Sequence, residues 1–368
     1  CFRVQHTVCC ARIFVSVKND LKVHIMSQMF IKVILAIAVL LAFIVPGYIL
    51  RKINMVDGGA KRALSAILLY VCQPALIISS FCVFTDEEWL VIEQLGPVAL
   101  VKDFVIAALI SLIAMIAVFG VCKLVFIKYK NRDRANIYSY VAVFSNCGFL
   151  GVPFIEILTD GSILAVMYLM IFNLVFALVV WTLGVWLLTG DRHNISIKKV
   201  LLNPSIISMI VALLLFFVPQ INFFMFDGVS ELQIFPEYLS TMTAPLSMII
   251  VGISMAEIPL KELFTDGGAY IAGALRLIAA PVVTFIIALL FRFMCADFLG
   301  STPQVEYVYL APVIAMAMSP AATVVAMAEQ YQKGGRTATI AFITNTLLSI
   351  VTVPLILMAV LQLWELIP

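Results

Sequence analysis

The sequence predicts an all-α integral membrane protein with ten transmembrane helices, arranged as two inverted five-helix repeats whose fourth helices are broken and cross. Three observations carry this prediction: the composition, the apolar segments of spanning length, and a repeat in the positions of helix-breaking residues. Of the 368 residues, 63% are hydrophobic and 12% are charged, whereas ordinary globular proteins have about 45 to 50% and about 25%. The composition therefore excludes an ordinary water-soluble domain.

A spanning helix needs about 20 mostly apolar residues. The segments that meet this requirement are residues 29–50, 63–83, 97–122, 135–158, 163–189, 203–219, 238–256, 268–291, 307–328 and 337–363. Repeat 1 is expected over 29–189 and repeat 2 over 203–368, with a cytoplasmic loop over 190–202 between them. Since the connecting loops are short, ligand recognition has to take place within the helix bundle.

Charged residues orient the predicted bundle, because Lys and Arg in short loops mark the cytoplasmic side. Alternate loops carry nearly all of them, namely Arg51, Lys52, Lys61, Arg62, Lys123, Lys128, Lys130, Arg132, Arg134, Arg192, Lys198, Lys199, Lys261, Lys333 and Arg336. The opposite loops are acidic and contain a single basic residue, Arg292. We therefore expect both termini outside a plasma membrane, which is the inner membrane in a bacterium.

Residues 1–28 fit this orientation poorly, since four basic residues precede the first predicted span. Met26 and Met29 stand directly before the apolar run. We expect the native start at one of these two methionines, which makes the upstream segment a doubtful extension. A targeting segment is the alternative, although it lacks a continuous apolar core.

The segment 135–158 contains Asn146, Cys147, Gly148, Gly151 and Pro153 within an apolar run. Glycine lowers helix propensity, and proline has no N–H for the preceding turn, so backbone polar groups come free in mid-span. Lipid cannot satisfy these groups. A helix broken at membrane depth is tolerated only where it is buried in protein or lines a wet cavity.

The positions of special residues indicate an internal repeat. The pairs are Pro46 with Pro219, Pro74 with Pro245, Pro153 with Pro320, and Asn173 with Asn345, each on corresponding spans. Because five spans are an odd number, the second repeat enters from the opposite face of the membrane. Its own break is expected over 317–322. Inverted repeats with two broken helices predict a secondary transporter whose site lies where the breaks cross.

At such a crossing, half-helix N-termini carry a partial positive charge and unpaired N–H groups, which suit an anion such as a carboxylate. Asn146 either binds this anion or caps the broken helix, and Ser319 has the same two alternatives. Gln73-Pro74 and Pro245 either line the site or simply kink their helices. The predicted substrate-binding residues are Asn146, Cys147, Gly148, Gly151, Pro153, Ser319, Pro320, Gln73, Pro74 and Pro245.

A charge within a span costs about 2.5 to 3.5 kcal/mol at mid-depth, and Lys102, Asp103 and Arg276 are the candidates for a role that explains this cost. Lys102 and Asp103 are near the outer start of their span, so an interfacial position is one explanation for them. Arg276 lies deeper, and the repeat offset places it beside the position equivalent to Asp103. We hypothesise that Asp103 and Arg276 neutralise each other or the cargo, and that Asp103 takes up a coupling proton.

The sequence contains no catalytic, phosphate-binding or metal-binding motif, and its cysteines fit the role of small hydrophobic residues. We therefore expect no enzyme activity, no metal, no cofactor and no nucleic-acid partner. The expected partners are the lipid bilayer and the anion, with coupling to a proton or sodium, and a homodimer is compatible with the pattern. A membrane-embedded receptor or enzyme is the remaining alternative class.

Five motifs carry a family resemblance: Gln73-Pro74-Ala75-Leu76, Asn146-x-Gly148-x-x-Gly151-x-Pro153, Asn203-Pro204, Pro245-Leu246 with Gly252, and Ser319-Pro320-Ala321-Ala322 followed by Glu329-Gln330-Tyr331. On these motifs, residues 29–363 resemble the auxin efflux carrier family, specifically its short bacterial-type permeases.

The resemblance implies an inverted-repeat transporter akin to bile-acid symporters and sodium/proton antiporters. Spans 1, 2, 6 and 7 would form a scaffold, and the other spans a moving transport domain. It also implies cargo such as auxin, malate or malonate, with Asn146 as the ligand-binding residue. A sodium-coupled symporter of the bile-acid type is the alternative. The chain departs from many plant members, since its loop 190–202 is short where theirs is long and hydrophilic, and this argues against auxin.

Overall fold

The computed structural model describes residues 42–190, 201–225, 230–299 and 305–367, together with residues 35, 38, 39 and 198. Every regular element in these ranges is helical, and they contain no β-strand. The predictions for residues 1–28, including a start at Met26 or Met29, lie outside the described residues, as do parts of the segments 29–50 and 190–202.

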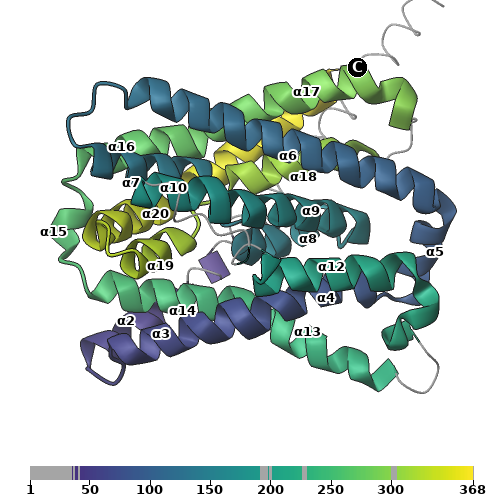
Figure 1. Cartoon of the computed structure of the whole chain (residues 1–368), viewed down its shortest axis with the longest axis horizontal. Coiled ribbons are helices and arrows are strands. Elements are labelled where there is room, and N and C mark those ends of the chain that lie inside the picture. Colours follow the sequence, from purple (N-terminus) through teal and green to yellow (C-terminus); the bar gives the residue numbers. More distant parts are fainter. Residues whose placement is uncertain are drawn as a thin grey trace, which may run out of the picture.

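The helices form two layers (Figure 1). The smaller layer consists of α2 (Ile44–Lys52), α3 (Gly58–Ile67), α4 (Gln73–Cys82), α12 (Pro204–Phe217), α13 (Ile234–Thr241) and α14 (Thr243–Ala256). The larger layer consists of α6 (Pro97–Val125), α7 (Arg132–Val143), α8 (Val152–Leu158), α9 (Ile163–Val179), α10 (Val185–Thr189), α16 (Gly267–Ala274), α17 (Ala280–Leu299), α18 (Glu306–Ala317), α19 (Thr323–Gln330) and α20 (Gly335–Leu366). The short helices α5 (Asp86–Leu95) and α15 (Leu260–Leu263) connect the layers.

Within the part of the chain that the structure describes, six helical stretches are long and apolar enough to cross a membrane: Gly58–Cys82, Pro97–Val125, Ile163–Thr189, Glu231–Ala256, Gly267–Cys295 and Gly335–Trp364. Three shorter apolar helices cover Cys147–Leu158, Pro204–Phe217 and Glu306–Ala317. The predicted spans 135–158 and 307–328 do not count as continuous helices because each is interrupted. A multi-pass helical membrane protein is therefore confirmed, while ten spans and the inverted repeat stay predictions.

Glycine permits the closest helix contact within the smaller layer. A Cβ atom on Gly252 of α14 would lie 2.1 Å from the carbonyl oxygen of Ile44, and one on Gly47 of α2 would lie 2.1 Å from that of Ile249. Small residues at helix crossings let backbones touch, which is how helices gain packing energy in lipid. The glycine of each helix therefore leaves room for the backbone of the other helix.

Pro74 and Pro245 both stand where a helical segment begins. Pro74 stands in the first turn of α4, directly after a π-helical turn at Leu68–Cys72. Pro245 stands in the first turn of α14. A first turn has no use for the missing N–H, and the π-helical turn absorbs the change in helix geometry at the earlier site.

Aromatic rings fill one part of the interface between the layers. Phe104 of α6 packs edge-on against Phe81 of α4, with ring centroids 5.9 Å apart, and it lies 6.1 Å from Phe216 and Phe217 of α12. Tyr168 of α9 packs edge-on against the other side of Phe104. We call these five residues the aromatic cluster, and their ring contacts join the two layers at this end.

Candidate functional site

Two helices of the larger layer are broken near the middle of the molecule. The first runs as α7 to Val143 and resumes with a π-helical turn at Cys147–Gly151 followed by α8. The second runs as α18 to Ala317 and resumes as α19 at Thr323. The first break therefore covers residues 144–146 and not the expected 146–153, because a π-helical turn accommodates the two glycines and Pro153 falls in the first turn of α8.

The two breaks pair with each other as antiparallel extended segments. The N–H of Asn146 donates to the carbonyl of Ser319 over 2.8 Å, and the N–H of Ala321 donates to the carbonyl of Phe144 over 2.9 Å. Pro320 lies in the middle of this pairing, where its missing N–H leaves no donor unsatisfied. Backbone groups released by one broken helix are therefore satisfied by the other, as burial requires.

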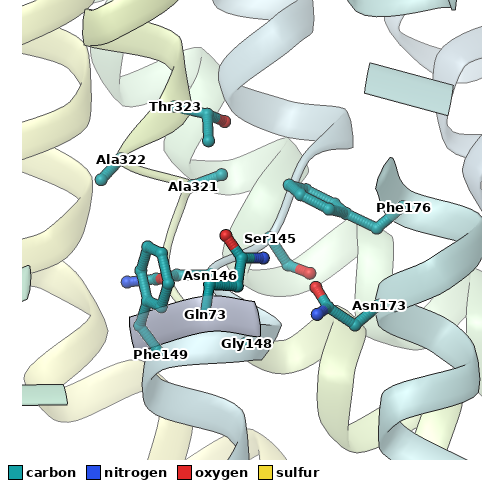
Figure 2. Close-up of a pocket in the computed structure, with 10 residues that line it drawn as sticks. All are labelled: Gln73, Ser145, Asn146, Gly148, Phe149, Asn173, Phe176, Ala321, Ala322 and Thr323. Carbon is teal, nitrogen blue, oxygen red and sulfur yellow. The ribbon is translucent and has the colours of Figure 1, made fainter. Parts of the chain in front are cut away.

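A small cavity of about 20 Å³ lies at this crossing, which is room for about one water molecule. Its lining residues are Gln73, Ser145, Asn146, Gly148, Phe149, Asn173, Phe176, Ala321, Ala322 and Thr323. The amide side chains of Gln73, Asn146 and Asn173 gather around it (Figure 2). Three amides from three different helices therefore meet at the crossing.

Several polar atoms at the crossing have no hydrogen-bond partner among the described residues. They are the Oγ atoms of Ser145 and Ser319 and the Nδ2 atom of Asn146, all fully buried. The helical turn that follows Asn146 has no side-chain cap, so the Asn146 side chain does not cap it. A buried donor without a hydrogen bond costs about 1 to 3 kcal/mol, and a bound ligand that accepts from it would remove this cost.

The ends of the half-helices differ in their surroundings. The amino end of α19 reaches the cavity through Ala322 and Thr323, and the turn after Asn146 does so through Gly148. The carboxyl ends of α7 and α18 face the guanidinium of Arg276, which is fully buried. The cavity is thus on the electropositive side of both breaks.

Arg276 and Asp103 do not form the predicted pair. Asp103 is 3% exposed and accepts a hydrogen bond of 2.7 Å from the hydroxyl of Tyr168. Arg276 instead donates to backbone carbonyls, and among the described residues no salt bridge joins it to Asp103. Lys102 is half-buried next to Asp103. Tertiary contacts determine the partners of Asp103 and Arg276. The residue spacing of the repeat therefore does not predict these partners.

Of the predicted site residues, Gln73, Asn146 and Gly148 line the cavity. Cys147 and Gly151 pack beside it, since the thiol of Cys147 donates to Asn173 over 3.5 Å and a Cβ on Gly151 would lie 3.3 Å from Leu169. The other predicted residues do not line the cavity, namely Pro74, Pro153, Pro245, Ser319 and Pro320.

Sequence reasoning missed Asn173, Phe176 and Thr323 as site residues. Asn173 was singled out only for its spacing in the repeat, although an uncharged polar residue deep in the apolar segment 163–189 is itself a signal. Phe176 follows Asn173 by one helical turn, so it lies on the same face of α9. Thr323 opens α19, and its hydroxyl lies 3.2 Å from that of Tyr140.

A second cavity of about 120 Å³ adjoins the first and shares Gln73, Phe176 and Thr323 with it. Its other lining residues are Leu69, Tyr70, Ala177, Val180, Trp181, Asn203, Pro204, Ser205 and Met327. These residues come from both layers, and Asn203 caps the start of α12 by accepting from the N–H of Ser205. The second cavity therefore lies between the layers on the side of the predicted cytoplasmic loop 190–202.

Broken helices that cross in the interior of a helical membrane bundle, with orphaned polar groups at the crossing, define the class of membrane transport proteins. Residues 32–357 match the family model described as "Membrane transport protein". The chain belongs to this family, the auxin efflux carrier family, which confirms the resemblance found in its motifs. Members are transporters rather than enzymes. No curated protein matches the chain.

Proposed function

We propose that this protein carries a small organic anion with one or two carboxylate groups across the plasma membrane, and that the anion binds at the helix crossing. The observation that carries the proposal is the set of buried, unpartnered polar atoms on Ser145, Asn146 and Ser319. They stand beside half-helix amino ends, whose N–H groups and partial positive charge favour an anion.

The cavities suggest the route. The larger cavity leads from the crossing toward the predicted cytoplasmic side, whereas the aromatic cluster closes the layers at the opposite end of α4. This arrangement corresponds to an inward-open state of an alternating-access cycle. We propose that the smaller layer is the scaffold and that the larger layer moves against it. We also propose ten spans of inverted topology, with both termini outside.

We propose a proton as the coupling ion, taken up by Asp103. This carboxyl is buried and bonded to Tyr168, and the charged or titratable groups around it are Lys102 and Tyr309. A buried carboxylate that can be neutralised at small cost is a common element of proton-coupled carriers. Uptake into vesicles that persists without sodium but needs a proton gradient is expected, and an absolute sodium requirement would favour the bile-acid type of symport instead.

Transport of labelled mono- and dicarboxylates into proteoliposomes tests the binding site. Asn146→Ala removes a donor to the anion and should raise KM by at least about tenfold, the value of one charge-assisted hydrogen bond. Asn146→Asp keeps the size but adds a negative charge, so it should abolish transport. Asn131→Ala makes the same change at an exposed helix cap and should leave KM unchanged. Wild-type KM values for every transported acid in Asn146→Ala would refute the site.

A further inference from the structure

Arg276 is the largest fully buried side chain of the described residues. It stands in a π-helical turn, Leu275–Ala279, between α16 and α17. Its Nη1 atom donates to the carbonyls of Ala142 and Val143 over 3.0 and 2.9 Å. Its Nε atom donates to the carbonyl of Met318 over 3.2 Å, and Nη2 donates to that of Met316.

All four acceptors belong to the carboxyl ends of the two broken helices. Ala142 and Val143 are in the last turn of α7, and Met316 and Met318 are at the end of α18. The last carbonyls of a helix have no partner within the helix and carry a partial negative charge of about half an elementary unit. One guanidinium therefore neutralises two helix ends at once, and its planar fork of donors suits this task.

A buried charge is costly unless it is paired and hydrogen-bonded. Among the described residues no carboxylate forms a salt bridge with Arg276, so the carbonyl dipoles act as its counter-charge. Its N–H groups are directed to the carbonyls of Ala142, Val143, Met316 and Met318. This geometry leaves the guanidinium committed to the protein rather than available to a cargo.

We infer that Arg276 is a positioning residue, which holds the carboxyl ends of both half-helices together so that their amino ends remain aimed at the anion. The inference rests on the proposed anion site for its functional meaning. It replaces the sequence-based hypothesis that Arg276 neutralises Asp103 or the cargo. It also ties α16 and α17 to the crossing, so that the broken helices and this helix pair move as one body.

Arg276→Lys in the full-length protein tests the inference, because lysine keeps the charge but offers one ammonium where arginine offers a fork. Two amide protons report the crossing directly, since the N–H groups of Asn146 and Ala321 bond across it. We expect hydrogen exchange of peptides covering 144–146 and 319–321 to accelerate by about tenfold or more, as one lost hydrogen bond would give. Arg292→Lys is the matched control, because Arg292 lies on α17 and binds Glu306 instead.

Transport kinetics supply the second measurement. A positioning role predicts that Arg276→Lys raises KM by the same factor for acids with one, two or three carboxylates. Direct binding of the cargo predicts a factor that grows with cargo charge, and this result would overturn the inference, as would unchanged exchange at both peptides. If no carboxylate is transported at all, the proposed function fails, while the exchange measurement still decides the role of Arg276.

Discussion

Single side chains at the surface tie the connecting segments of this protein to its helices. Glu262, in the short helix α15 between the layers, forms a bidentate ion pair with Arg336 at the start of α20. The hydrogen bonds from Arg336 hold the pKa of the Glu262 carboxyl below its ordinary value. Because both groups are exposed, solvent screens the pair and its contribution to stability is small.

The lowered pKa of Glu262 gives a prediction with a defined sign. A carboxyl with a depressed pKa in the folded state stabilises the protein above its unfolded pKa, and this stabilisation is lost as pH falls through the folded pKa. Glu262→Gln should therefore lower the melting temperature slightly at pH 7, and the difference from wild type should shrink as pH falls through the folded pKa of Glu262. Glu93→Gln, also at an exposed position, is the control. A difference that grows as pH falls would contradict the assignment.

The helices α2 and α14 depend on a close approach of their backbones. The α2 and α14 backbones meet where Gly47 and Gly252 leave no side chain between them. A larger residue there collides with backbone atoms, which cannot rotate away as a flexible side chain can. The contact between these helices is therefore set by two positions.

Gly252→Val should separate α2 from α14 and lower the melting temperature of the purified protein, because overpacking costs about 1 to 3 kcal/mol or more. Gly120→Val is the matched control, since a Cβ on Gly120 of α6 meets no atom within 4 Å. Thermal unfolding in detergent, followed by the loss of monodisperse protein, measures both. Equal effects of the two substitutions would show that helix propensity, and not the close approach, is responsible.

The elements also show what sequence could predict. Proline acts on its own helix, so Pro153 and Pro320 indicated both interruptions from the sequence alone. The partner of Arg276 depends on where two distant helix ends meet, and no local pattern contains that information. Likewise, Asn173 becomes a site residue only because α9 passes beside the first break. The class of helical membrane protein and its two interrupted helices were therefore predictable, whereas the contacts of buried polar side chains were not.

At the scale of the whole molecule, the aromatic cluster closes one end of the interface between the two layers, and the second cavity lies at the other end. Phe104 contributes edge-on or tilted contacts to rings of both layers. Each aromatic pair of this kind is worth about 0.5 to 1.5 kcal/mol. Loss of these pairs should shift the proposed alternating-access equilibrium away from the inward-open state.

Phe104→Ala should accordingly reduce the accessibility of the second cavity. A single cysteine in place of Ser205, in a cysteine-free background, reports this through its reaction rate with a membrane-impermeant thiol reagent added on the cytoplasmic side. We expect a slower reaction in Phe104→Ala. Phe285→Ala, which removes an aromatic pair with Trp364 within the larger layer, should leave the rate unchanged. A faster or equal rate in Phe104→Ala would contradict the sealing role of the cluster.

The antiparallel pairing of the two breaks has a consequence for the transport cycle. The backbone groups of Phe144, Asn146, Ser319 and Ala321 form hydrogen bonds with one another. Release of the cargo therefore leaves none of these main-chain hydrogen bonds unmade. Only a few side-chain donors lose a partner, and one water molecule fits the space they surround. The main chain at the crossing therefore needs no cargo to satisfy its hydrogen bonds. The carrier can reset without a return cargo, so we expect net flux driven by the proton gradient and not obligatory exchange.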